Sequence, residues 1–276
     1  MMYITRDKTT QFHALHHAES PLLLSNAWDA ASARIAEATG VSAIATTSAG
    51  ISWAAGLPDG DYLERSRAVA VAESIIGASE LPVTADIEGG YADTAYGVSE
   101  TVKAFLDVGV VGINIEDGDR SADDAGNRIA MAKKAADSAG VDLFINARTD
   151  VFLKEAGPDE DLVSLAVSRA ERFIDAGADG IFVPGATEID TVAALVERID
   201  APLNLMVGPG APTVQDLAAL GVARVSLGSA VAQAAYAVVK NATAELLTSG
   251  SYSRLEDSLD YSSLNDLASM NHSADQ

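Results

Sequence analysis

The segment "LDVGVVGINIE", residues 106–116, combines the end of a helical pattern, a glycine turn and a buried strand. Gly109 lies at the expected C-terminal end of the helix. Glycine is favoured at this position because it adopts positive φ without strain. The same arrangement recurs in "IDAGADGIFVP", residues 174–184, and "AALGVARVSLG", residues 218–228. A repeated unit of helix end, turn and buried strand predicts a parallel sheet covered by helices.

Short apolar runs rich in β-branched residues alternate with alanine-rich helical segments along the chain. We expect eight strands, near Leu22–Asn26, Ala43–Ser48, Pro82–Ile87, Gly112–Asp117, Leu143–Thr149, Gly180–Gly185, Pro202–Val207 and Ala223–Gly228. Eight strands alternating with helices predict a (β/α)₈ barrel, with a doubly wound open sheet as the alternative. No linker divides the chain, so residues 1–276 are expected to form one domain, with about 241–276 as a C-terminal helical extension and tail.

Composition limits the classes of function. The 276 residues include no cysteine, which excludes disulfides, thiolate metal sites and a cysteine nucleophile and fits a reducing cytoplasm. No apolar run approaches the roughly 20 residues that span a bilayer, and no secretory signal is expected at the N-terminus. The formal net charge of −22 argues against nucleic acid or an anionic membrane as a partner. A small anionic substrate would therefore need a local cation, either arginine or a metal.

Acidic side chains gather where strands are expected to end. Asp86 and Glu88 lie two residues apart, so on a regular strand both would point to one face. Glu116 ends the neighbouring strand. Three oxygen donors on adjacent strand ends suit a hard cation such as Mg²⁺ or Mn²⁺. The alternative is that these carboxylates cap helices or face solvent.

Arg148 follows the apolar run "LFIN". A guanidinium at a strand end could bind a substrate carboxylate or phosphate through two hydrogen bonds. The alternative is a structural ion pair with Asp150 or with a strand-end carboxylate. The four histidines, His13, His16, His17 and His272, lie near the termini, and we expect them to be solvated rather than catalytic.

Four motifs occur in an order that resembles the phosphoenolpyruvate mutase/isocitrate lyase family. They are "GLPD" (56–59), "ADIEGGY" (85–91), "GINIEDG" (112–118) and "INARTD" (145–150), and the similarity runs from about residue 22 to about residue 240. The central motif of that family is D-x-D-x-G-Y-G, and here it reads D-I-E-G-G-Y-A. The resemblance implies a (β/α)₈ barrel that uses a divalent metal, usually Mg²⁺, to hold the enolate of a 2-oxo acid.

The resemblance also implies residue roles. Asp86 would be the principal metal ligand, with Glu88, Glu116 and Asp59 binding directly or through water. Arg148 would bind the carboxylate or phosphoryl group of the substrate. Substrate binding would also involve Thr47, Ser48, Ala49 and Asn204. Homodimers or homotetramers, with C-terminal helices packed across subunits and including the leucines between Leu246 and Leu267, are implied as well.

One region departs from the family. The lyases carry a K-[KR]-C-G-H loop after the fourth strand, whereas this chain has the shorter "GDRSADDAGN", residues 118–127. Only Arg120 and Asn127 stand where the mutases use lysine and asparagine. We therefore expect a C–C lyase for a small 2-oxo or 2-hydroxy carboxylate, with proton transfer by water or by a loop residue such as Arg120. The alternatives are a phosphonomutase, an oxaloacetate or phosphonopyruvate hydrolase, and a barrel that binds carboxylate and metal without catalysis.

Overall fold

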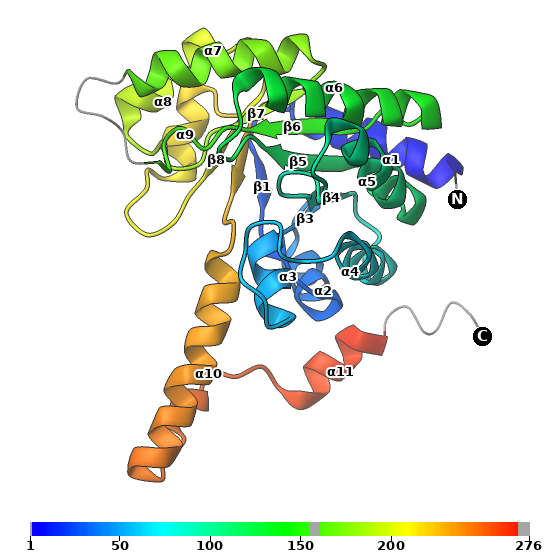
Figure 1. Cartoon of the computed structure of the whole chain (residues 1–276). Coiled ribbons are helices and arrows are strands. Elements are labelled where there is room, and N and C mark those ends of the chain that lie inside the picture. The colour runs from blue at the N-terminus through cyan, green and yellow to red at the C-terminus, as the bar shows by residue number, and fades with distance from the viewer. Residues whose placement is uncertain (1, 155–160, 270–276) are drawn as a thin grey trace.

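A parallel β-barrel surrounded by helices forms the body of the molecule (Figure 1). The computed structural model describes residues 2–154 and 161–269. The strands of this part of the chain are β1 (Leu22–Leu24), β2 (Asn26–Ala27), β3 (Ile44–Thr46), β4 (Val83–Asp86), β5 (Gly112–Glu116), β6 (Phe144–Arg148), β7 (Gly180–Phe182), β8 (Leu203–Met206) and β9 (Arg224–Ser226). All of their pairings are parallel, in the order β1-β9-β8-β7-β6-β5-β4-β3-β2.

The first strand is divided into two short segments, and each segment pairs with a different neighbour, which closes the barrel. Leu22–Leu24 pairs with β9, whereas Asn26–Ala27 pairs with β3 on the other side. Only Ser25 separates the two segments, so β1 and β2 together occupy one strand position. The eight strands expected from the sequence are thus confirmed, and the (β/α)₈ barrel rather than the open sheet is the fold.

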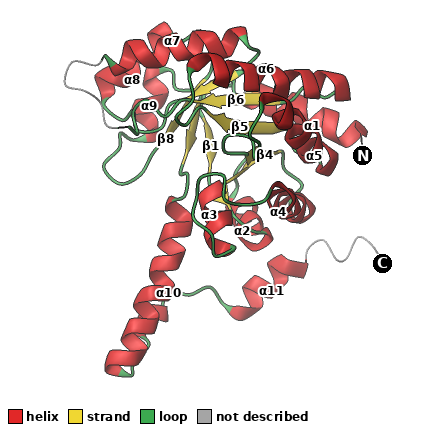
Figure 2. Ribbon diagram, in the orientation of Figure 1, coloured by secondary structure: helices red, strands yellow, loops and turns green. Residues whose placement is uncertain are grey.

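Helices alternate with the strands and cover the outside of the barrel (Figure 2). They are α1 (Met2–Leu15), α2 (Ala30–Thr39), α3 (Ser48–Ala54), α4 (Arg65–Ala78), α5 (Ala95–Val108), α6 (Ala122–Ala139), α7 (Leu162–Asp175), α8 (Ile189–Arg198), α9 (Val214–Leu220), α10 (Ala230–Ser249) and α11 (Tyr261–Ser269), with a 3₁₀ turn η1 (Ser253–Leu255). Gly109 ends α5 at φ 102° and donates its N–H to the carbonyls of Leu106 and Phe105, as the glycine turn predicts.

Two different cores hold these layers together. Apolar side chains from strands and helices, such as Ile113, Phe105 and Ile129, fill the space between barrel and helices. The inside of the barrel is polar instead. Its buried side chains include Asn26, Thr84, Asn114, Asn146, Asn204 and Arg224. Since barrels of this type are usually filled with branched aliphatic residues, a polar interior indicates a use for these groups.

The N-terminal helix packs against the starts of the strands. Phe12 is fully buried there and belongs to one apolar cluster with Leu22, Val111 and Phe144. His16 stacks on Phe144 with ring centroids 3.8 Å apart, and its Nδ1 donates to the Phe12 carbonyl at 2.8 Å. Its exposed fraction is only 4 %. The prediction of a solvated His16 is therefore wrong, because α1 carries the ring into the protein; His272 lies outside the described residues.

Burial of His16 makes the stability of the fold depend on pH. Burial, helped by the nearby Arg224 charge, lowers the pKa of His16 from 6.5 to about 3. Between these values the unfolded chain binds a proton that the folded chain does not, so stability is lost as pH falls below 6.5. Between pH 7 and pH 5 we expect wild type to lose about 2 kcal/mol relative to His16→Gln. Denaturant unfolding at both pH values measures this difference, with His17→Gln as the control for losing one histidine; a difference that does not change with pH would contradict it.

Of the two C-terminal helices, α10 extends away from the barrel (Figure 1). α10 leaves the barrel after β9, and its apolar residues Val239, Leu246 and Leu247 are exposed. α11 returns to the barrel at α2, where Arg34 Nη1 donates to the Leu267 carbonyl at 2.7 Å. The leucines of α10 thus do not pack on the barrel of their own chain. None of the described helices combines the length and apolar character that crossing a membrane requires.

Candidate active site

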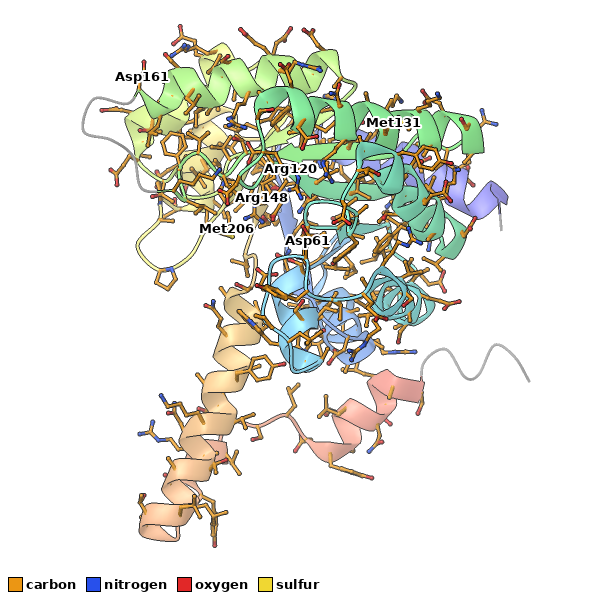
Figure 3. All side chains as sticks on the ribbon, viewed as in Figure 1. Asp61, Arg120, Met131, Arg148, Asp161 and Met206 are labelled. Atoms are coloured by element: carbon orange, nitrogen blue, oxygen red, sulfur yellow. The ribbon has the colours of Figure 1, made fainter. Side chains whose placement is uncertain are left out.

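A small cavity opens at the C-terminal ends of the strands, the end at which barrel enzymes carry their active sites. Its volume is about 160 Å³, and the lining residues are Asn26, Thr47, Ser48, Ala49, Asp59, Asp86, Asn114, Arg148, Phe182, Met206, Ser226, Gly228 and Ser229. Figure 3 labels Arg148 and Met206 at this end of the barrel. Of the site residues expected from the sequence, Thr47, Ser48, Ala49, Asp59, Asp86 and Arg148 meet here.

Asp86 is the last residue of β4 and is held from three sides. Ser48 Oγ donates to its Oδ2 at 2.9 Å, and the Glu88 N–H donates to its Oδ1 at 3.3 Å. Its own N–H donates to Thr46 Oγ1 at 2.8 Å. These bonds orient the carboxylate at the cavity wall before any ligand is bound.

Asp59 approaches the same cavity from the loop between α3 and α4. Burial raises the pKa of Asp59, and the negative charge of Asp86 raises it further. A hydrogen bond from Ser48 acts to lower the pKa of Asp59. Two carboxylates thus share a small volume in which their mutual repulsion is incompletely compensated.

Glu88 takes a different position from the one that strand geometry predicts. β4 ends at Asp86, and Glu88 has φ 51°, so the alternation of a regular strand does not continue to it. The expectation that Asp86 and Glu88 share one strand face is wrong for this reason. Glu88 is buried beside the cavity, where its Oε2 accepts from the Asp61 N–H and the Tyr91 side chain is a neighbour of the carboxyl group. Burial raises its pKa to about 7.

Arg148, at the end of β6, forms ion pairs and also lines the cavity. Its Nη1 lies 2.7 Å from Glu116 Oε2, its Nε lies 2.6 Å from Asp150 Oδ1, and the guanidinium lies 5.8 Å from the centroid of the Phe182 ring. Both structural pairs considered for this arginine are therefore present. No hydrogen bond from Nη2 is found among residues 2–154 and 161–269, so this nitrogen remains available to donate to a ligand.

The environment of Glu116 combines burial with several charges. Burial, together with Asp86, Asp150 and Asp59, raises its pKa to about 8, while Arg148 acts to lower it. For Arg148 burial acts to lower the pKa, but Glu116 and Asp150 raise it above its usual value. Arg148 thus stays cationic in a site that is otherwise acidic.

A buried arginine that the sequence did not single out supports the loop after Asp86. Arg128, on α6, donates from Nη1 to the carbonyls of Gly89 and Ala92 at 3.1 and 2.9 Å. Its Nη2 donates to the Asp93 carbonyl at 2.9 Å. These three bonds fix the course of the chain just beyond the Asp86 carboxylate. The helical pattern around Arg128 gives no sign of this contact.

Five residues considered at the site do not line the cavity: Glu88 and Glu116, described above, and Asn204, Arg120 and Asn127. Asn204 is buried deeper in the barrel, with Nδ2 bonded to the Leu205 carbonyl and to Ser226 Oγ at 3.2 and 3.3 Å. Arg120 lines a separate cavity, with its Nη2 3.6 Å from Asp61 Oδ2. Asn127 lies on α6 and accepts from Arg172. Asn114, by contrast, lines the cavity although no sequence pattern singled it out; it lies two residues before Glu116 on the same strand face.

The oxygen donors of the cavity are compatible with a divalent cation. Within the described residues no group of three or more His, Cys, Asp or Glu side chains is arranged to hold a metal ion. Mg²⁺, however, often binds one or two carboxylates and keeps several waters. Asp86 and Asp59 supply that number of carboxylates, and a cation between them would relieve the repulsion that raises the pKa of Asp59.

Comparison with known proteins identifies the family of the chain. Residues 12–247 match the family model described as phosphoenolpyruvate phosphomutase. The chain is 32 % identical over 232 residues to an oxaloacetate decarboxylase of Pseudomonas savastanoi pv. phaseolicola, covering 79 % of this chain and 77 % of the relative. It is 30 % identical over 216 residues to a 2-methylisocitrate lyase of Shewanella oneidensis, covering 72 % and 70 %. A crystal structure from Burkholderia cenocepacia J2315, provisionally assigned as a phosphonomutase, has 41 % identity and a TM-score of 0.82, covering 86 % of this chain and 99 % of that one.

Proposed function

The chain belongs to the phosphoenolpyruvate mutase/isocitrate lyase superfamily, and on that premise we propose that it is a Mg²⁺-dependent lyase for a small 2-oxo or 2-hydroxy carboxylate. The observation that carries the proposal is the meeting of Asp86 and Arg148 in one cavity of about 160 Å³. Relatives that act on 2-methylisocitrate and oxaloacetate support the substrate class. The cavity volume suits a small acid rather than a large ligand.

In this proposal Asp86 is the direct ligand of the cation. Asp59, Glu88 and Glu116 contribute through water or as further ligands, and Mn²⁺ is an alternative to Mg²⁺. When bound, the cation supplies positive charge to the carbonyl and carboxylate oxygens of the substrate. Ser48 keeps Asp86 in place through its hydroxyl, at 2.9 Å.

The remaining residues bind and orient the substrate. Arg148 Nη2 donates to a carboxylate oxygen, while Nη1 and Nε stay paired with Glu116 and Asp150. Ser48 and Ala49 line the cavity at the start of α3, and no hydrogen bond from their N–H groups is found in the described structure. These N–H groups donate to the second oxygen of the substrate carboxylate. Both contacts stabilise the enolate charge that develops when the C–C bond breaks.

Proton transfer is assigned to a water molecule. No histidine, lysine or cysteine lines the cavity in the described part of the chain, and Arg120 is directed to Asp61 instead. In a 2-oxo acid with a carboxylate on C3, the bond to that carboxylate breaks, CO₂ leaves, and the electron pair forms the enolate of the remaining 2-oxo acid. In a 2-hydroxy acid, water takes the hydroxyl proton, the hydroxyl carbon leaves as the carbonyl of a 2-oxo acid, and the electron pair forms the enolate of the other carboxylate fragment. A proton from water then completes the product at the carbon that lost its partner.

The test is a substrate panel. Purified protein is incubated with Mg²⁺, or with EDTA, and with oxaloacetate, 2-methylisocitrate, dimethylmalate, phosphonopyruvate or phosphoenolpyruvate, and products are identified by NMR. Metal-dependent C–C cleavage supports the proposal. Phosphoryl rearrangement or hydrolysis would instead establish a mutase or a hydrolase. Ligand-dependent stabilisation without any product would indicate a non-catalytic binder.

We further propose that the protein works in the cytoplasm as a homodimer or homotetramer. Leu247 on α10 is 79 % exposed, and Val239 and Leu246 are exposed beside it, an apolar surface that a second copy would cover. Leu247→Glu is expected to shift the protein towards monomers in light scattering. Val214→Glu, in the first turn of α9 where an acid is favoured, is the control. Equal masses for wild type and Leu247→Glu would contradict this assembly.

A further inference from the structure

Asn114 stands between the polar interior of the barrel and the cavity. It lies on β5, is 6 % exposed and lines the cavity wall. Its Oδ1 accepts from Asn146 Nδ2 at 2.9 Å and from Arg224 Nη2 at 3.2 Å. A guanidinium has donors and no acceptor, so the atom that faces Arg224 must be the oxygen of the amide. The orientation of Asn114 is therefore determined by chemistry.

This orientation leaves the amide nitrogen free. Oδ1 accepts from Asn146 and Arg224 on the side of the barrel interior, so Nδ2 lies on the opposite edge of the planar amide. No hydrogen bond from Nδ2 is found among the described residues. The other asparagine of the cavity differs, since Asn26 Nδ2 donates to the Thr46 carbonyl at 2.9 Å. Asn114 thus offers the cavity a neutral amide donor that Asn26 does not.

We propose that Asn114 Nδ2 donates a hydrogen bond to an oxygen of the bound 2-oxo carboxylate, and that Arg224 is a positioning residue that holds the amide in this orientation. The inference rests on the proposed function, since it names a further contact to the same substrate. It assigns Asn114 to substrate binding and gives a role to a buried charge that the mechanism does not otherwise use.

The buried position of Arg224 is unfavourable for folding, so a role for this residue needs to be identified. It is 1 % exposed, its Nε and Nη1 have no partner, and no carboxylate within the described chain forms an ion pair with it. Burial lowers its pKa to about 9, opposed only by Asp86, so it remains charged at neutral pH. A buried charge without an ion-pair partner is destabilising. The one hydrogen bond that its side chain makes in the described structure goes to Asn114.

The test measures the affinity for oxalate in the presence of Mg²⁺ by calorimetry. In Asn114→Asp, both carboxylate oxygens are acceptors; one faces Arg224, and the other replaces the donor that faced the cavity. We expect this variant to bind oxalate at least about tenfold more weakly, because it loses a hydrogen bond to a charged group and adds a negative charge beside the anion. Asn114→Ala loses the bond without adding a charge and should still bind about tenfold more weakly. Thr84→Val, which alters a hydroxyl in the barrel interior outside the cavity lining, is the control and should bind oxalate as wild type does.

The positioning role is tested by a double-mutant cycle. Arg224→Met should weaken oxalate binding in wild type but should have no further effect in Asn114→Ala, and Arg224→Lys, which keeps a donor, should restore part of the affinity. If Arg224→Met does not fold, Arg224→Lys is compared in both backgrounds instead. Unchanged affinity in Asn114→Asp, or equal effects of the Arg224 change in both backgrounds, would overturn the inference while leaving the proposed function intact. If wild type itself fails to bind oxalate with Mg²⁺, the proposed function fails and the inference fails with it.

Discussion

Asp86→Asn is expected to reduce metal-dependent turnover by about a thousandfold or more, the equivalent of the several kcal/mol that a catalytic cation supplies. Asparagine has nearly the same shape; its Oδ1 can still accept the Glu88 N–H, and its Nδ2 can donate to the Ser48 hydroxyl, so the fold should survive. What is lost is the negative charge that we propose holds the cation. Steady-state kinetics and Mg²⁺ titration by calorimetry would measure both effects in the same preparation.

The matched control is Asp93→Asn. It removes the same charge seven residues further along the same loop, where the side chain is exposed and outside the cavity lining. Its turnover and Mg²⁺ affinity should stay close to those of wild type. If Asp86→Asn keeps the Mg²⁺ affinity of wild type, Asp86 is not the metal ligand, whatever happens to turnover.

The second large effect concerns stability. Asp117, directly after β5, is 1 % exposed; Oδ2 accepts from Thr149 Oγ1 at 2.7 Å and from Arg169 Nη1 at 2.8 Å, and Oδ1 accepts from the Asp150 N–H at 2.9 Å. Asp117→Ala removes the partner of three donors, one of them charged. We expect it to lower the free energy of unfolding by about 3–5 kcal/mol, as for breaking a buried ion pair.

Denaturant unfolding measures this loss. The control is Asp119→Ala, which removes an exposed carboxylate two residues away. We expect this control to change the free energy of unfolding by less than about 0.5 kcal/mol. Because Asp117 holds the backbone of Asp150, which pairs with Arg148, the variant should also bind substrate more weakly. A loss below about 1 kcal/mol would mean that Thr149 and Arg169 find other partners.

The barrel was predictable because its signals are local and repeated. The glycine at 109 and the run that follows it produce a helix end and a buried strand whatever surrounds them, since both depend on backbone conformation and apolar periodicity. The same reasoning placed Asp86 and Arg148 at strand ends, and parallel strands in a closed barrel must bring such ends together. Their positions in one cavity are consistent with that expectation.

Local patterns failed where the chain leaves regular structure or where the partner is distant in sequence. Glu88 and Tyr91 have φ of 51° and 47°, so strand alternation could not place their side chains. His16 sits near the N-terminus, and only the packing of α1 against Phe144 buries it. Nothing in "GVARVSLG" indicates that the arginine points into the barrel and reaches an asparagine 110 residues earlier in the chain.

The sequence by itself therefore determined the barrel, and it predicted a candidate site at the strand ends with most of the acidic and basic groups that line or adjoin the cavity. These follow from backbone preferences and from the period of apolar residues, which act within a few neighbours. The tertiary structure alone decided which groups are paired, buried or free: Arg148 between Glu116 and Asp150, Arg120 away from the cavity, and Asn114 held by Arg224. Desolvation and hydrogen bonding set these states, and both depend on atoms brought together only when the barrel closes.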